Sequence, residues 1–174
     1  MTSKPRFLMC PPDYYEVDYV INPWMEGNIH KSSRATAATQ WETLCGLLEQ
    51  EAQVDRIAPV SGLPDMVFTA NAGIALGKKF VLARFLPRER QGEEPLFKKW
   101  FKKQGFEVLE LPADLPFEGA GDALLDHVIE DREENQRADG IKNQFAPRSL
   151  PLNLAAQLDD APLFGRPKFC GRDA

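Results

Sequence analysis

The 174 residues have the length of one domain, and 43% hydrophobic with 27% charged residues is ordinary for a globular protein. The formal net charge of −5 provides no basic field for phosphate backbones, which argues against nucleic-acid binding. We expect no membrane span and no signal peptide, because no apolar window approaches the roughly 18 residues that a span needs. Three widely spaced cysteines, Cys10, Cys45 and Cys170, favour a reducing cytoplasm over a disulfide framework or a zinc site.

The first half of the sequence predicts a strand, a helix and a second strand. The apolar run at residues 7–10 ends at two prolines and predicts a buried strand, after which residues 13–25 form an aromatic and polar loop. A helical pattern begins at Ser33, and a second strand is predicted at residues 57–60. The apolar face of this helix is formed by Trp41, Leu44, Cys45 and Leu48.

The second half predicts more short strands and one further helix. Apolar runs at residues 66–68 and 73–76 are followed by a Gly-Lys-Lys turn and a run at residues 80–83, which predicts a hairpin. Apolar positions four apart predict a helix at residues 96–101 that ends at Gly105. Residues 107–111 are the next predicted strand, and residues 117–125 turn through Gly119 and Gly121 into a last apolar run.

The alternation of short strands with helices indicates an α/β fold, and the pattern supports neither a TIM barrel nor a Rossmann domain. The composition of the sequence changes after residue 126. A charged block at residues 130–137 precedes a stretch in which apolar residues show no sustained helical or strand periodicity. We therefore divide the chain into residues 1–126, the N-terminal part of a domain, and residues 127–174, a divergent tail. Composition alone fits a loosely structured or foreign tail and a natural extension equally well.

Three polar clusters, at residues 63–73, 83–93 and 117–122, lie where predicted strands end. Each cluster by itself is typical of a turn or a solvated surface. Together they indicate a binding site, because α/β folds build their sites at strand ends. The side chains that these clusters carry include Asp65, Asn71, Arg84, Arg90, Glu118 and Asp122.

A guanidinium group would suit the chemistry of these clusters. It is planar, cationic and rich in N–H donors, so its site needs acceptors close to one plane. An arginine-like compound also carries an α-carboxylate, for which Arg84 or Arg90 is a suitable partner. The acceptors available for the guanidinium are Asp65, Asn71, Glu118 and Asp122.

Four motifs resemble those of the amidinotransferase and dimethylargininase family, whose members modify guanidine groups. They are residues 7–12 (FLMCPP), 21–25 (INPWM), 68–73 (FTANAG) and 117–122 (FEGAGD). The resemblance covers residues 5 to 126. Within the family, the sequence resembles most the branch of bacterial arginine dihydrolases and related amidinotransferase-like proteins. The resemblance implies a pentein-type α/β propeller of five ββαβ modules, of which this chain would hold the first two to three and so an incomplete ring.

The resemblance also implies roles for individual residues. Glu118, at the catalytic position, would hold the guanidinium and orient a histidine, and Arg90 would seat the amino-acid end of the substrate. Asn71 stands where related deiminases carry an aspartate, and its amide could hold a neutral ureido intermediate as well as a guanidine. The substrate-binding positions are then Asn22, in a loop at the entrance, with Asp65, Asn71, Arg90 and Asp122.

The family reaction uses a cysteine nucleophile and a proton-shuttling histidine, and this sequence lacks both at the expected places. No histidine follows His127, and Cys170 has no family pattern around it. Cys10 and Cys45 lie in apolar runs typical of a core, and His30 lies in a loop. No metal and no cofactor is expected.

The leading interpretation is therefore a truncated N-terminal portion of a guanidine-modifying hydrolase that is inactive by itself and takes an arginine-like small molecule. One alternative is a non-catalytic arginine- or guanidine-binding module, and another is amidinotransferase activity in the parent enzyme. Exposed strand edges in an unfinished ring would also favour an oligomer or a complementing chain that supplies the missing histidine and cysteine.

Overall fold

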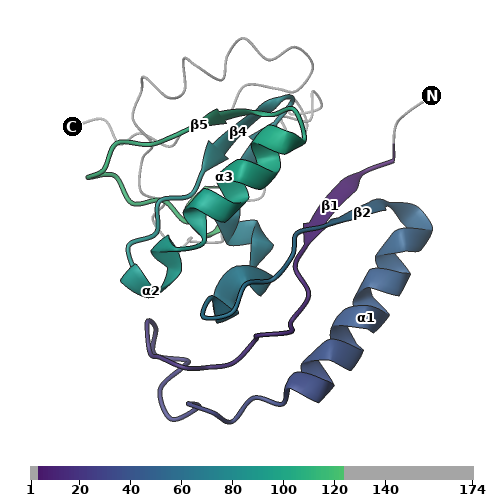
Figure 1. Ribbon diagram of the computed structural model, residues 1–174, viewed down its shortest axis with the longest axis vertical. Helices are drawn as coiled ribbons and strands as arrows, with labels where there is room; N and C mark the ends of the chain where they lie inside the picture. Colours follow the sequence, from purple (N-terminus) through teal and green to yellow (C-terminus); the bar gives the residue numbers. More distant parts are fainter. Residues whose placement is uncertain (1–3, 124–174) are drawn as a thin grey trace, which may run out of the picture.

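A computed structural model describes residues 4–123, in which two units with β-α-β connectivity lie side by side (Figure 1). The tail at residues 127–174 falls outside the described residues. Among the helices of the described part, none combines the length and apolar character that a membrane crossing requires. The α/β class expected from the sequence is confirmed.

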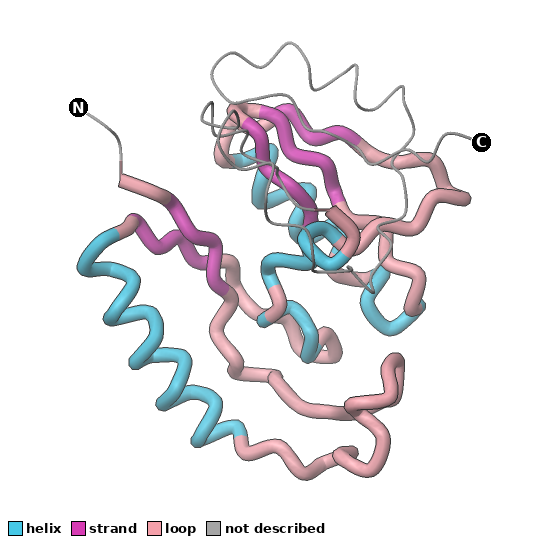
Figure 2. The backbone as a smooth tube through the Cα atoms, turned by 180° about the vertical axis from the view of Figure 1, so that it is seen from behind, coloured by secondary structure: helices cyan, strands magenta, loops and turns pink. Residues whose placement is uncertain are grey.

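The first unit consists of β1 (Arg6–Met9), α1 (Arg34–Glu51) and β2 (Gln53–Arg56). The two strands pair in parallel, and α1 makes the crossover between them along the outside of the molecule (Figure 1). The Ser33 hydroxyl caps α1 by accepting a hydrogen bond from the Thr36 N–H at 3.3 Å. A long irregular loop joins β1 to α1 and runs along the lower edge of the molecule (Figure 2).

Three details predicted for this unit are wrong. The buried strand expected at residues 7–10 is β1 at Arg6–Met9, and it is not buried, since Phe7 is 44% exposed. The strand expected at residues 57–60 is β2 instead, because its polar residues pair along β1 and form ion pairs, such as Arg6 with Asp55 at 2.6 Å. The apolar Ile57 follows the strand and is buried in the core. The apolar face expected on α1 is incomplete as well, since Leu44 is 47% exposed.

The second unit consists of β3 (Gly73–Leu76), β4 (Lys79–Leu82), α3 (Glu94–Lys103) and β5 (Glu107–Leu109). β3 and β4 form an antiparallel hairpin, and α3 carries the chain to β5, which pairs in parallel with β4. The resulting order β3-β4-β5 is a complete ββαβ module. The predicted hairpin and helix are confirmed, whereas β5 is shorter than the expected strand at residues 107–111.

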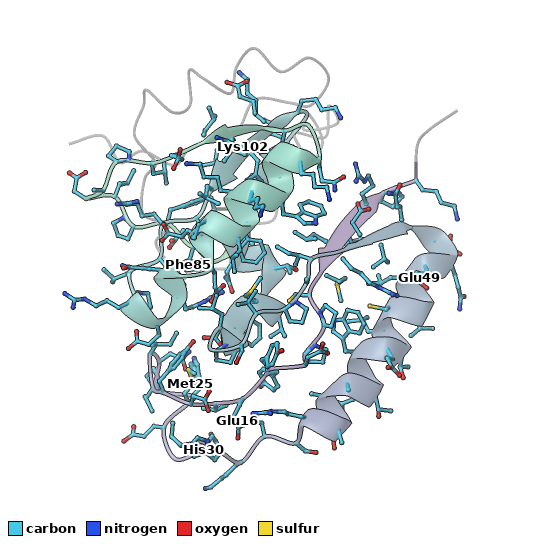
Figure 3. All side chains as sticks on the ribbon, viewed as in Figure 1. Glu16, Met25, His30, Glu49, Phe85 and Lys102 are labelled. Atoms are coloured by element: carbon cyan, nitrogen blue, oxygen red, sulfur yellow. The ribbon has the colours of Figure 1, made fainter. Side chains whose placement is uncertain are left out.

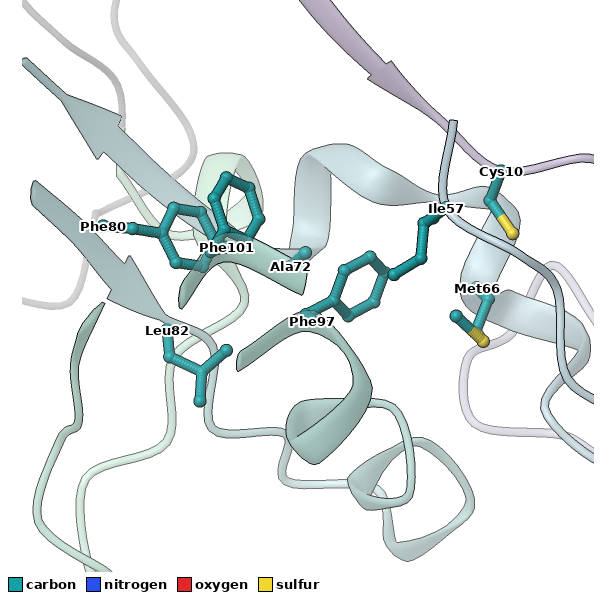
Figure 4. Packing of buried hydrophobic residues seen from close by; sticks show 8 residues of the cluster. All are labelled: Cys10, Ile57, Met66, Ala72, Phe80, Leu82, Phe97 and Phe101. Atoms are coloured by element: carbon teal, nitrogen blue, oxygen red, sulfur yellow. The ribbon is translucent and has the colours of Figure 1, made fainter. Parts of the chain in front are cut away.

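The main core lies between the two units and joins them (Figure 4). The rings of Phe80 on β4 and Phe101 on α3 are stacked, with their centroids 3.5 Å apart. Aromatic packing of this kind adds to the hydrophobic stabilisation. The cluster is completed by Cys10, Ile57, Met66, Ala72, Leu82 and Phe97.

Short turns carry the polar clusters. Pro64–Val67, Thr69–Ala72 and Gly119–Gly121 are 3₁₀ turns, and α2 (Arg88–Gln91) is a single helical turn that the sequence analysis missed. The strand predicted at residues 66–68 is wrong, because backbone N–H groups in this stretch bond to carbonyls three residues earlier. These compact turns place Asp65 and Asn71 at one pocket, which is described below.

Candidate functional site

A pocket of about 570 Å³ opens between the β1–α1 loop and the polar turns. The loop contributes one wall, and Figure 3 places Glu16, Met25 and His30 on it. The other wall comes from the 3₁₀ turns and α2. The lining residues are Tyr15, Val17, Ile21, Asn22, Trp24, Met25, Asn28, Lys31, Ser32, Asp65, Phe68, Asn71, Arg90 and Glu118.

Five of the six predicted site residues line this pocket, and Asp122 does not. The Asp122 carboxylate instead accepts a hydrogen bond from the backbone N–H of Glu118 at 2.7 Å, within the 3₁₀ turn. Asp122 therefore fixes the backbone from which Glu118 extends. The residues brought together at the pocket are Asn22, Asp65, Asn71, Arg90 and Glu118.

The two turns that carry Asn71 and Glu118 meet closely. The Asn71 side-chain Nδ2 donates to the Glu118 carbonyl at 3.3 Å. Gly119 adopts a left-handed φ of +57°, and a Cβ built there would lie 2.6 Å from the Ala70 carbonyl oxygen. A glycine is needed at this position, because any side chain would push the two turns apart.

Arg90 lies at the floor of the pocket with its side chain only 5% exposed. Its Nε and Nη2 each donate to one Glu93 carboxylate oxygen at 2.9 Å, and Nη2 also donates to the Asp65 carbonyl at 3.3 Å. Nη1 donates to the Asn71 Oδ1 at 3.3 Å, and the guanidinium lies 4.2 Å above the centre of the Phe85 ring. Most of its donors are thus engaged within the protein.

Arg84, the other arginine considered for the substrate carboxylate, does not line the pocket. Its backbone bridges to Phe117, and its guanidinium lies 3.9 Å from the Glu94 carboxylate. Of the two arginines that the sequence left open, the geometry therefore favours Arg90.

Asp65 is buried and links the pocket floor to the loop. The Tyr19 hydroxyl donates to the Asp65 Oδ2 at 2.8 Å, which joins residues 46 positions apart. Burial, together with the bond to Asp65, raises the pKa of the Tyr19 hydroxyl. Tyr19 therefore stays protonated and remains a donor to the carboxylate.

The pocket floor carries more negative than positive charge. Burial raises the pKa of Glu93, and the nearby carboxylates of Asp65 and Glu118 raise it further. The hydrogen bonds and charge of Arg90 lower this pKa, but by less. Burial opposes the charge on Arg90, but the Glu93 bond and the same carboxylates outweigh it and raise the Arg90 pKa. The Glu93 shift thus follows mainly from burial, whereas the Arg90 shift follows from the carboxylates around its guanidinium.

One group of metal-ligating side chains lies on the loop. Ligand atoms of Glu16, Asp18 and His30 fall within 4.8 Å of one another. The other Glu16 oxygen is already bonded to Arg34 at 2.7 Å, and His30 and Asp18 are exposed. A neighbouring guanidinium and open solvent are a poor setting for a metal ion.

Neither a cysteine nor a histidine is among the pocket-lining residues of the described part. Cys10 is fully buried, and burial raises the pKa of its thiol to about 12. Such a thiol is unsuited to nucleophilic attack at neutral pH. His127 and Cys170 fall outside the described residues.

Several site residues were missed by sequence reasoning. Glu93 follows Arg90 by three positions, a helical spacing that could have suggested an ion pair. Tyr19 gave no signal, because its partner is far away in the sequence. The Ser32 hydroxyl is buried at the pocket without a hydrogen-bond partner among the described residues.

Known proteins are similar to this chain over most of its length. A bifunctional arginine dihydrolase/ornithine cyclodeaminase of Nostoc sp. is 68% identical over 126 residues, which are 72% of this chain and 18% of that protein. A dimethylarginine dimethylaminohydrolase of Mycobacterium tuberculosis is 39% identical over 121 residues, 69% of this chain and 39% of its own length. No protein-family model matches the chain.

Solved structures agree. The N-terminal domain of the cyanobacterial arginine dihydrolase ArgZ, bound to substrate, is 65% identical with a TM-score of 0.69, and the match covers 70% of this chain and 45% of that domain. AgrE in complex with L-arginine is 66% identical with a TM-score of 0.70, over 71% of this chain and 19% of AgrE. A dimethylarginine dimethylaminohydrolase at 18% identity and a TM-score of 0.59 shares the fold, a pentein α/β propeller. The chain thus spans less than half the length of each of these proteins.

Proposed function

Because the matched residues of this chain belong to the guanidine-modifying family of arginine dihydrolases and dimethylargininases, we propose that the pocket holds an arginine-like guanidino compound. The observation that carries this proposal is the charge of the pocket floor. Glu93 neutralises Arg90 beneath the pocket, which leaves the carboxylates of Asp65 and Glu118 against one further lining cation, Lys31. A planar cation entering the pocket would offset the one excess carboxylate.

Asp65 and Glu118 are the acceptors assigned to the guanidinium. Both line the pocket, and the Glu118 carboxylate forms no ion pair among the described residues. Asn22 and the unpartnered Ser32 hydroxyl lie on the opposite wall and supply further polar groups. The aromatic rings of Tyr15, Trp24 and Phe68 provide apolar surface for the aliphatic part of the ligand.

We further propose that the chain binds its ligand without turning it over. The pocket presents carboxylates but no thiol or imidazole from the described residues, and covalent attack on a guanidine carbon requires a nucleophile and a proton carrier. The chain would supply the guanidine-binding part of a hydrolase. The relatives include an arginine dihydrolase and a dimethylaminohydrolase, which supports hydrolysis over amidino transfer as the reaction of the parent enzyme.

Isothermal titration calorimetry of the full chain with L-arginine and L-citrulline tests the binding proposal. Citrulline has the same shape but a neutral ureido group, so arginine should bind at least about tenfold more tightly, or about 1.4 kcal/mol. E118Q should remove most of this preference. E110Q, on an exposed glutamate paired with Lys98, removes the same charge away from the pocket and should leave it unchanged. Equal affinity for both ligands would contradict the proposal.

A further inference from the structure

We propose that Glu93 is a positioning residue for ligand recognition, because it determines which N–H groups of Arg90 face the pocket. This inference rests on the proposed function, since it concerns how the same pocket recognises the carboxylate end of an arginine-like ligand. Glu93 does not itself line the pocket, and no role follows for it from the family motifs.

The contact between the two residues is a two-pronged clamp. Glu93 is 0% exposed, and its two oxygens accept from Nε and Nη2 of Arg90, both at 2.9 Å. The Asp65 carbonyl accepts from Nη2 as well. These bonds engage one edge of the planar guanidinium, so rotation of the arginine about its last bonds is blocked.

The remaining edge of Arg90 is its Nη1, which has one hydrogen-bond partner among the described residues, the Asn71 Oδ1 at 3.3 Å. Nη1 carries two hydrogens, so one remains for a ligand. A carboxylate in the pocket can then reach Arg90 only at Nη1. Without the clamp, the guanidinium could present either edge.

The same contact orients the Asn71 amide. Because Nη1 donates to Oδ1, the Nδ2 group points the other way and donates to the Glu118 carbonyl at 3.3 Å. Glu93 thus acts on the pocket through two successive hydrogen bonds.

The test compares E93Q with E89Q in the full chain. Glu89 is exposed and lies on α2, the helical turn that carries Arg90, so E89Q removes an equal charge beside Arg90 without touching the clamp. The ligands are L-arginine and agmatine, which share the guanidinium, while agmatine lacks the carboxylate. We expect E93Q to weaken arginine binding at least about tenfold and agmatine binding less than about threefold, while E89Q changes neither by more than about twofold.

Other outcomes are also decisive. If E93Q lowers both affinities by the same factor, or lowers neither, Glu93 is a structural residue and the inference is wrong. If wild-type protein binds neither ligand, the proposed function itself fails, which is a distinguishable result.

A second measurement covers the case in which E93Q does not fold. In the wild-type protein, side-chain NMR should detect a slowly exchanging Arg90 Nε–H that neither ligand shifts. The Asn71 amide and Arg90 Nη1 signals should shift with arginine and not with agmatine. Equal shifts with both ligands, or a rapidly exchanging Nε–H, would overturn the inference.

Discussion

Asn71 and Glu118, 47 positions apart in the chain, are joined by a hydrogen bond from the Asn71 Nδ2 to the Glu118 carbonyl at 3.3 Å. This contact holds two 3₁₀ turns together and places an amide beside a carboxylate in one pocket. The close approach depends on a glycine and on the fixed orientation of the amide. Both dependences can be tested by substitution.

The first prediction concerns Gly119. Its left-handed φ of +57° and the Ala70 carbonyl 2.6 Å from a built Cβ make G119A both strained and crowded. Gly62 has φ +83° with no atom within 4 Å of a built Cβ, so G62A carries the backbone strain alone. In urea unfolding we expect G62A to cost about 1 kcal/mol and G119A at least about 2 kcal/mol. Equal losses would show that the turns are not tightly apposed.

The second prediction concerns the Asn71 amide. N71D adds a negative charge among carboxylates, which favours a cationic ligand over a neutral one. Calorimetry should show the preference for arginine over citrulline rising by roughly tenfold. N28D, at the exposed rim of the pocket, should raise it less. In a complete relative, the equivalent change should shift the reaction toward stopping at a citrulline-type product, and an unchanged product ratio would count against this role.

Tyr19 provides the third prediction. Y19F removes the donor to a buried Asp65 oxygen and should lower the free energy of unfolding by about 1 to 2 kcal/mol. Y14F removes an equivalent hydroxyl from an exposed tyrosine and should have almost no effect. A Y19F protein as stable as Y14F would mean that the loop is not held to the pocket floor by this bond.

Cys10 gives a prediction that depends on pH. With a pKa near 12 rather than 9.0, the folded thiol has roughly a thousandfold less thiolate near pH 8 than an ordinary cysteine. Alkylation of Cys10 near pH 8, followed by mass spectrometry, should therefore be slow in native protein and fast in urea. The unfolded chain also gains thiolate as pH rises above about 9 while the folded chain does not, so stability should fall there. Rapid native labelling would show that Cys10 is accessible.

The fold was predictable where apolar periodicity and turn glycines specify the elements. The β3–β4 hairpin and α3, with Phe97 and Phe101 buried, follow from such patterns. β2 was misplaced because three of its four residues are polar, and its position is fixed by pairing with β1 rather than by hydrophobicity.

The site was predictable only in its residue types. Acids, amides and arginines at segment ends indicated Asp65, Asn71, Arg90 and Glu118, which the fold brings together. The distances that set their chemistry come from tertiary contacts, such as the clamp of Glu93 on Arg90. The place of Asp122, bonded to the backbone of Glu118 and away from the pocket lining, had no sequence signal.

Equilibrium dialysis of the full chain against radiolabelled L-arginine, followed by chemical identification of the recovered ligand, tests the central claim most directly. The predicted result is one arginine bound per chain and recovered unchanged. Absence of binding would contradict the guanidine pocket, and recovery as ornithine with released ammonia would show that this chain holds the nucleophile and proton carrier that its pocket is proposed to lack.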